Sequence, residues 1–135
     1  MLKFSTKSKE RLATVHPDLQ DVFNTAIQVS NVDFGIADGL RTIERQKEYV
    51  AIGRSQTMNS RHLHGLAVDV YVWNIHNALW DRDAILYIYQ LVAGICAVKN
   101  IPFEWGGNWH TFPDAPHFEL CRKRYPDDEN ILKQL

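Results

Sequence analysis

Three side chains suited to bind one metal ion are split between two distant stretches of this chain, and any fold must bring them together. They are His62 and Asp69, in the stretch SRHLHGLAVD, and His117, in the stretch DAPHFE. Two imidazoles and one carboxylate, with a fourth position left to water, make up a catalytic zinc site. Because His62 and Asp69 are too far apart for one helical face, we expect a loop to fold His62 back over a strand that carries Asp69. His117 would then come from a neighbouring strand, so that the ligands converge on a rigid sheet.

Each of these residues also has an ordinary structural interpretation. A lone histidine near a loop is usually exposed or hydrogen-bonded, and an aspartate in a strand usually forms an ion pair with a basic side chain. The spacing of His62 and Asp69 is not one of the widely used zinc signatures. From spacing alone, a metal site and a structural role therefore both stay open. Gly65 permits the tight path that the metal site requires.

Hydrophobic periodicity predicts an alternation of helices and strands. Helices are expected over 17–29, from the cap Thr42 to about Ile52, and over 84–99 after the cap Asp81, with stops at Gly53 and Asn100. Strands are expected over 32–37, 66–72, 101–105 and 117–121, with connections over 54–60 and 74–79. Strands separated by helices, with a hairpin late in the chain, favour an α+β fold with a small antiparallel sheet flanked by helices.

Length and charge limit the possible organisation and partners. With 135 residues, 45% of them hydrophobic, the chain can build one core but not two ordinary domains. We expect a single domain over 1–135, with a charged tail, about 122–135, that packs loosely. The formal net charge of -1 gives no large electrostatic argument for binding nucleic acid or an anionic membrane, since both need a concentrated basic face.

The sequence also carries expectations about compartment and cysteines. The first ten residues lack the apolar segment and cleavage site of a secretory signal, so we expect the protein to stay in the cytoplasm where it is made. The most apolar stretch, 84–98, is shorter than the roughly 20 residues that span a bilayer, which argues against stable membrane insertion. Nothing in the spacing of Cys96 and Cys121 demands a disulfide, and we expect two buried free thiols.

Two further residues are candidates for the chemistry. Asp114 lies three residues before His117, where a carboxylate could take a proton from an attacking water and pass it to a leaving amine. Its alternative role is to form a turn. Arg41 offers a permanently charged fork that could hold a substrate carboxylate or stabilise a developing oxyanion. Its alternative is a surface arginine at the start of a helix.

Taken together, these motifs resemble a known family. The resemblance rests on Ser60-x-His62-x-x-Gly65-x-Ala67-x-Asp69, then Glu104-Trp105-Gly106-Gly107-x-Trp109, then Asp114-x-Pro116-His117-Phe118-Glu119, preceded by Gly39-Leu40-Arg41-Thr42-x-x-Arg45-Gln46. This pattern is similar to the zinc D-Ala-D-Ala carboxypeptidase and L-alanyl-D-glutamate endopeptidase family, above all to its single-domain phage endolysins. The resemblance covers about residues 1 to 121 and implies a hedgehog/DD-peptidase-like zinc peptidase fold.

The resemblance also implies a role for each matching residue. His62, Asp69 and His117 would bind Zn²⁺, with Asp114 as the catalytic base and Arg41 polarising the scissile carbonyl. Support or substrate contact is expected from residues near the cleft: Gln46, Ser60 and, as an alternative to core packing, Trp105 and Trp109. His64 is expected to be exposed or close behind the ligands, and His16 and His76 to be structural or surface residues. Asn108 and His110 depart from the family pattern and leave the substrate preference open.

The function implied is hydrolysis of the stem peptide of bacterial peptidoglycan, with the L-alanyl-D-glutamate bond preferred, by a monomeric phage endolysin. Such an enzyme would be made in the cytoplasm of the host bacterium and reach the wall through a membrane lesion of the holin type. One alternative is a D,D-carboxypeptidase or D-Ala-D-Ala dipeptidase, which shares the ligands but closes its pocket around a terminal carboxylate. Another is a zinc-containing module that binds the cell wall without cutting it. Asp114 argues against that module, because a structural zinc site needs no base.

Overall fold

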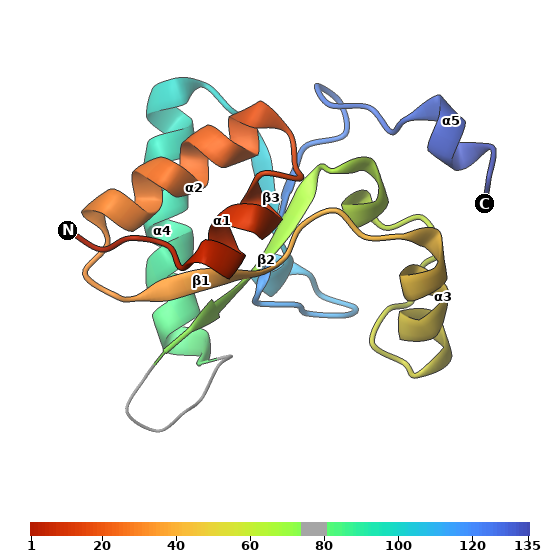
Figure 1. Cartoon of the computed structure of the whole chain (residues 1–135), viewed down its shortest axis with the longest axis horizontal. Coiled ribbons are helices and arrows are strands. Elements are labelled where there is room, and N and C mark those ends of the chain that lie inside the picture. The colour runs from red at the N-terminus through yellow and green to blue at the C-terminus, as the bar shows by residue number, and fades with distance from the viewer. Residues whose placement is uncertain (74–80) are drawn as a thin grey trace.

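A four-stranded antiparallel sheet, in the order β1-β2-β4-β3, forms the centre of the protein. The structure is a computed structural model that describes residues 1–73 and 81–135. The strands are β1 (Phe34–Asp38), β2 (Ala67–Val72), β3 (Phe103–Trp105) and β4 (His117–Leu120). The helices are α1 (Thr6–Leu12), α2 (Pro17–Val29), α3 (Ile43–Ala51), α4 (Arg82–Lys99) and α5 (Glu129–Leu132), with single 3₁₀ turns η1 (Arg61–His64) and η2 (Gly106–Asn108). The expected α+β architecture with a small antiparallel sheet is confirmed (Figure 1).

The three helices expected from the sequence, α2, α3 and α4, begin and end close to where local signals predict, whereas α1 and α5 were not expected. Thr42 caps α3 by accepting a hydrogen bond from the Arg45 amide, and Asp81 caps α4 in the same way. Gly53, with φ of 82°, follows the end of α3, and Asn100, with φ of 57°, ends α4. The expected connection over 74–79 and the expectation for His76 lie outside the described residues.

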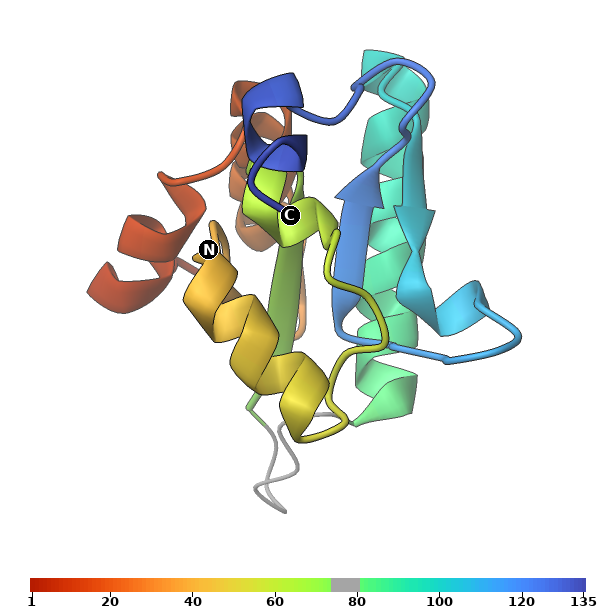
Figure 2. The same ribbon diagram turned by 90° about the vertical axis from the view of Figure 1, so that its right-hand side faces the viewer.

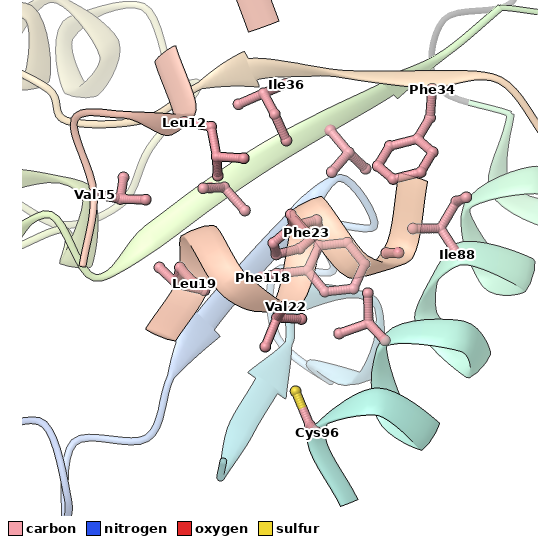
Figure 3. Close-up of a cluster of buried hydrophobic side chains, with 14 of the residues drawn as sticks. Leu12, Val15, Leu19, Val22, Phe23, Phe34, Ile36, Ile88, Cys96 and Phe118 are labelled. Carbon is pink, nitrogen blue, oxygen red and sulfur yellow. The ribbon is translucent and has the colours of Figure 1, made fainter. Parts of the chain in front are cut away.

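The core lies between the sheet and helices α2 and α4, which cover the same face of the sheet (Figure 1). Val68 and Val70 of β2 point to this face and are fully buried, whereas Asp69 between them points to the other face. Figure 3 shows the side chains of α2, α4, β1 and β4 that meet here; those labelled include Leu19, Val22, Phe23, Ile36, Ile88 and Phe118. With one face of the sheet buried, its opposite face is free to carry polar side chains.

Helix α3 lies on the opposite side of the sheet from α4 (Figure 2). The segment that follows β3 runs out on this same side before the chain returns along β4. In the described part of the chain, no helix is both long enough and apolar enough to cross a membrane. Cys96 and Cys121 are free thiols, as expected; Cys96 is buried and its burial raises the pKa to about 12, while Cys121 is only half-buried.

The C-terminal segment differs from the loosely packed tail expected over 122–135. The Tyr125 ring is buried and its hydroxyl donates to Asp18 Oδ2 over 2.6 Å. Asp127 Oδ1 accepts a hydrogen bond from Nη1 of the buried Arg61 over 2.7 Å. A buried guanidinium requires acceptors, and this segment supplies them, which is why the first part of the tail is held against the domain.

Candidate metal centre and cleft

The structure brings together the three side chains that the sequence separates. One ligand atom from each of His62, Asp69 and His117 lies within 4.8 Å of the others. Asp69 Oδ1 is 3.1 Å from His62 Nε2 and 3.2 Å from His117 Nδ1, so these three atoms face a common point. Such a set matches the two imidazoles and one carboxylate of an open zinc site.

Two different local structures position these atoms. Asp69 and His117 are direct partners across the antiparallel pair of β2 and β4, so their side chains leave the sheet side by side. His62 lies in η1, which ends at Gly65 with φ of 67°, and this left-handed turn returns the chain to β2. The expected path, a loop that folds His62 back over the strand with Asp69, is the path observed.

The second nitrogen of each imidazole is bound to the protein. His62 Nδ1 is 2.8 Å from the carbonyl oxygen of Gly39, and His117 Nε2 is 2.9 Å from Glu119 Oε1. Both partners are acceptors, so these nitrogens donate, and the opposite nitrogens, which face Asp69, are the ones that would bind a cation. Metal-ligating histidines are usually held in this way. The donor set therefore fits a zinc ion.

The charge of the cluster also suits a cation. Burial alone would raise the pKa of Asp69, but the charge of His62 and hydrogen bonds from His117 and His62 hold it well below its usual value. Burial would lower the pKa of His117, whereas hydrogen bonds to Asp69 and Glu119 raise it to about 10. The surroundings of His117 thus favour positive charge at this point.

Arg41 lies next to the cluster in a rigid setting. Its Nε and Nη2 donate to Asp38 Oδ2 over 2.9 and 2.6 Å, its Nη1 donates to Gln46 Oε1 over 2.8 Å, and Nη2 is 3.5 Å from Asp69 Oδ2. Gln46 is fully buried, and its amide nitrogen donates to Ser55 and to the Thr57 carbonyl. Gln46 therefore holds Arg41 and the following loop in place and is not among the cleft-lining residues, so of the two roles expected of it, support and substrate contact, its contacts fit support.

Asp114 is half-buried beside the cluster, at the place where the chain approaches β4. Its pKa is raised by burial and by the charge of Asp69, with partial compensation from His117, His62 and Arg41. Its amide donates to the carbonyl of Gly106 over 2.9 Å. A Cβ atom at Gly106 would overlap the Asp114 carbonyl oxygen, so only glycine allows this close approach.

These residues line one cleft of about 730 Å³. Its walls come from the end of α3 with the loop to η1 and from the segment between η2 and β4, two segments that can be followed in Figure 2. Ser60, Trp109 and Asp114 line it together with the three candidate ligands. Trp109 lies with its ring 5.1 Å from that of His117, whereas Trp105 is buried, stacks on Tyr89 and belongs to the core.

A buried ion-pair network behind the cluster was not foreseen from the sequence. Arg61 Nε lies 3.7 Å from Glu119 Oε2, and its Nη2 donates to the carbonyl oxygens of Leu120 and Tyr125 over 2.8 and 2.6 Å. The His64 side chain is buried rather than exposed, and its Nδ1 accepts from the Asp128 amide. His16 is structural, as expected, since its ring caps α2. The residues that form these contacts are about 60 positions apart in the sequence, so no local pattern could have predicted them.

Comparison with known proteins agrees with the motifs and the geometry. The sequence profile of the family described as phage L-alanyl-D-glutamate peptidase matches residues 1–126. The chain belongs to this family. It is 31% identical over 133 residues to the L-alanyl-D-glutamate peptidase of Escherichia phage T5, covering 91% of this chain and 92% of that protein.

Two further similar proteins come from bacteria. The peptidoglycan L-alanyl-D-glutamate endopeptidase CwlK of Bacillus subtilis (strain 168) is 27% identical over 128 residues, covering 78% of this chain and 73% of CwlK. The crystal structure of the L-Ala D-Glu endopeptidase ChiX of Serratia marcescens is similar in fold, with a TM-score of 0.83 and 41% identity, covering 92% of this chain and 94% of ChiX. The family and fold inferred from the sequence motifs are confirmed.

Proposed function

We propose that this protein is a zinc-dependent peptidoglycan endopeptidase, a phage endolysin that cleaves the L-alanyl-D-glutamate bond of the stem peptide. The observation that carries the proposal is the convergence of His62 Nε2, Asp69 Oδ1 and His117 Nδ1 within 4.8 Å at the wall of the cleft. The names of the relatives from phage T5, B. subtilis and S. marcescens support the choice of bond.

His62, Asp69 and His117 would hold the zinc ion, which when bound polarises a carbonyl oxygen and lowers the pKa of water. The residues around it supply the remaining functions. Arg41 has more N–H groups than its bonds to Asp38 and Gln46 use, and these can donate to the carbonyl oxygen as negative charge develops there. The rigid setting of Arg41 makes this donor pre-organised.

Asp114 would act as general base and then as general acid. Its half-buried carboxyl has a raised pKa, which suits a group that accepts a proton from the attacking water and returns it to the departing amine. Trp109 and Ser60 form the adjoining walls of the cleft, where the peptide on either side of the bond would lie. We assign these two residues to substrate contact.

The biological setting belongs to the same proposal. Its partner would be the stem peptide of bacterial peptidoglycan, with no nucleic acid involved. We propose that the protein acts as a monomer, from the cytoplasm of a host bacterium, and reaches the wall through a holin-type lesion. The relative from Escherichia phage T5 supports the phage part of this setting.

The test separates metal binding from catalysis. Asp114→Ala is expected to keep its zinc, because the carboxyl is not one of the ligands, and to lose hydrolysis of purified peptidoglycan by a factor of about 100 or more. Asp33→Ala is the matched control, because Asp33 is exposed and is not among the residues that line the cleft. Zinc content by elemental analysis and release of soluble peptide are measured on both variants. An Asp114→Ala protein that hydrolyses as fast as the parent would overturn the mechanism.

A further inference from the structure

The cleft holds arginines whose charges are used in different ways. Arg41 is bonded to Asp38 and lies 3.5 Å from Asp69, so two carboxylates already balance its charge. Arg61 is likewise paired with Asp127. Arg54 and Arg122 also line the cleft, and within the described residues no carboxylate lies within 4 Å of either guanidinium group. An uncompensated cation at the wall of a cleft is a candidate for binding an anion.

Arg54 is nevertheless held in place. Its guanidinium carbon lies 4.5 Å from the centre of the Tyr49 ring, and that of Arg41 lies 4.5 Å from the same ring. The Arg54 amide donates to the Tyr49 carbonyl over 2.9 Å, just after the left-handed turn at Gly53. Stacking on an aromatic face uses the plane of the guanidinium and leaves the N–H groups at its edge available for a bidentate partner.

The shared Tyr49 ring places Arg54 one residue beyond the reacting centre. Arg41 contacts both this ring and Asp69, so the order from the candidate metal site outward is Asp69, Arg41, Tyr49, Arg54. A group bound by Arg54 would therefore belong to a residue next to the scissile bond. Arg41, with its charge already balanced, is a weaker site for a second full carboxylate.

The proposed substrate carries such an anion. A glutamyl residue has two carboxyl groups, and a peptide chain that continues through one of them leaves the other as a free carboxylate beside the bond to alanine. We propose that Arg54 binds this free carboxylate and so determines the preference for a glutamyl residue on the amine side of the cleaved bond. This inference rests on the proposed endopeptidase function. A bidentate guanidinium-carboxylate pair is lost when the carboxylate becomes a carboxamide.

The test uses two synthetic stem peptides that contain the alanyl-D-glutamyl bond and differ only at the free carboxyl, which is a carboxylate in one and a carboxamide in the other. We expect the zinc-loaded protein to cleave the carboxylate peptide with a kcat/KM about 10- to 100-fold higher, the range for one charge-assisted hydrogen bond. Arg54→Ala is expected to remove this preference, and Arg54→Lys to retain part of it, since lysine keeps the charge without the fork.

Two variants serve as controls. Arg45→Ala removes a guanidinium that contacts the same Tyr49 ring, at 5.5 Å, but does not line the cleft, so the preference should persist. Arg122→Ala removes the other exposed arginine of the cleft and should also leave the preference for the carboxylate peptide unchanged. Equal cleavage of both peptides by the parent protein, or a preference that survives in Arg54→Ala or is lost in Arg122→Ala, would overturn the assignment of Arg54. Failure of the parent to cleave either peptide would instead overturn the proposed function, and this inference with it.

Discussion

Glu119 holds His117 in the orientation that turns its Nδ1 toward Asp69. The Glu119 carboxylate accepts from His117 Nε2 over 2.9 Å, and both side chains leave β4 on the same face because they are two residues apart. Because Nε2 is held by Glu119, Nδ1 is the ring nitrogen that would bind a metal ion in place of its proton. This contact makes Glu119 a positioning residue for the candidate metal centre.

Replacing Glu119 with alanine should therefore weaken zinc binding. Removal of such an outer partner of a ligating histidine typically costs about 10- to 100-fold in metal affinity. Competition with a chromophoric chelator measures this affinity directly. Glu119→Gln, which keeps an acceptor oxygen, should lose less, and Glu104→Ala should lose nothing, since Glu104 is the exposed partner of Glu119 across the β3 and β4 pair. Unchanged affinity in Glu119→Ala would contradict this role.

Arg61 is expected to matter for stability. Its side chain is almost entirely buried and donates to Asp127 and to the carbonyl oxygens of Leu120 and Tyr125. Arg61→Met would leave these acceptors buried without a donor, so the free energy of unfolding should fall by about 3–5 kcal/mol. Urea unfolding measures the change, with Arg122→Met at an exposed position as the control. A loss no larger than that of the control would refute this expectation.

The pH dependence of stability should report the same network. Burial would raise the pKa of Asp127, but hydrogen bonds from Asn59 and Arg61 lower it below its usual value. Its ionised form therefore stabilises the folded state above the unfolded pKa of about 3.9, and this contribution is lost as the pH falls through the lower folded pKa. The difference in unfolding free energy between the parent and Asp127→Asn should be constant above about pH 5 and shrink below about pH 4. A difference that grows on acidification would contradict the assignment.

The elements that local patterns specify could be predicted from the sequence. Helix α2 matches its predicted range of 17–29, and the caps Thr42 and Asp81 lie where predicted, because both depend on neighbours within one helical turn. The strands were found with ends shifted by one or two residues, as for β1, because pairing partners rather than propensity decide where a strand stops. The convergence of His62, Asp69 and His117 was foreseen because the strand pattern allowed it and the motifs around them resemble those of a zinc peptidase family, whereas their spacing alone left it open.

The supporting contacts could not be predicted in this way. Arg61 and Asp127 are 66 positions apart, and no short-range pattern connects a buried arginine to an acceptor in a charged tail. Gln46 looked like a cleft residue from its motif, but whether a side chain points into a cleft or beneath it depends on how α3 packs on the loop that follows. For Asp38, the sequence indicated only that it stands at the end of a strand, and not that it accepts hydrogen bonds from Arg41. Long-range packing decides such contacts.

Gly106→Ala should disturb catalysis without disturbing the metal. The added Cβ would overlap the Asp114 carbonyl, so the segment that carries the proposed base must move. We expect hydrolysis to fall by about 10-fold or more with zinc affinity unchanged. Gly94→Ala is the matched control, because a Cβ there meets no atom within 4 Å and lies in α4, where alanine should stabilise the helix by about 0.5–1 kcal/mol. If both variants hydrolyse peptidoglycan at the parental rate, Gly106 does not position Asp114.

The most direct test of the whole account is the mass of the products released from purified peptidoglycan stem peptides by the zinc-loaded protein. Cleavage at the proposed bond leaves alanine on the sugar-linked fragment and frees a peptide that begins with D-glutamate. Chelation of the metal should abolish both products, and added zinc should restore them. The account predicts this pair of fragments. Release of D-alanine alone would contradict it, because that product belongs to a D,D-carboxypeptidase.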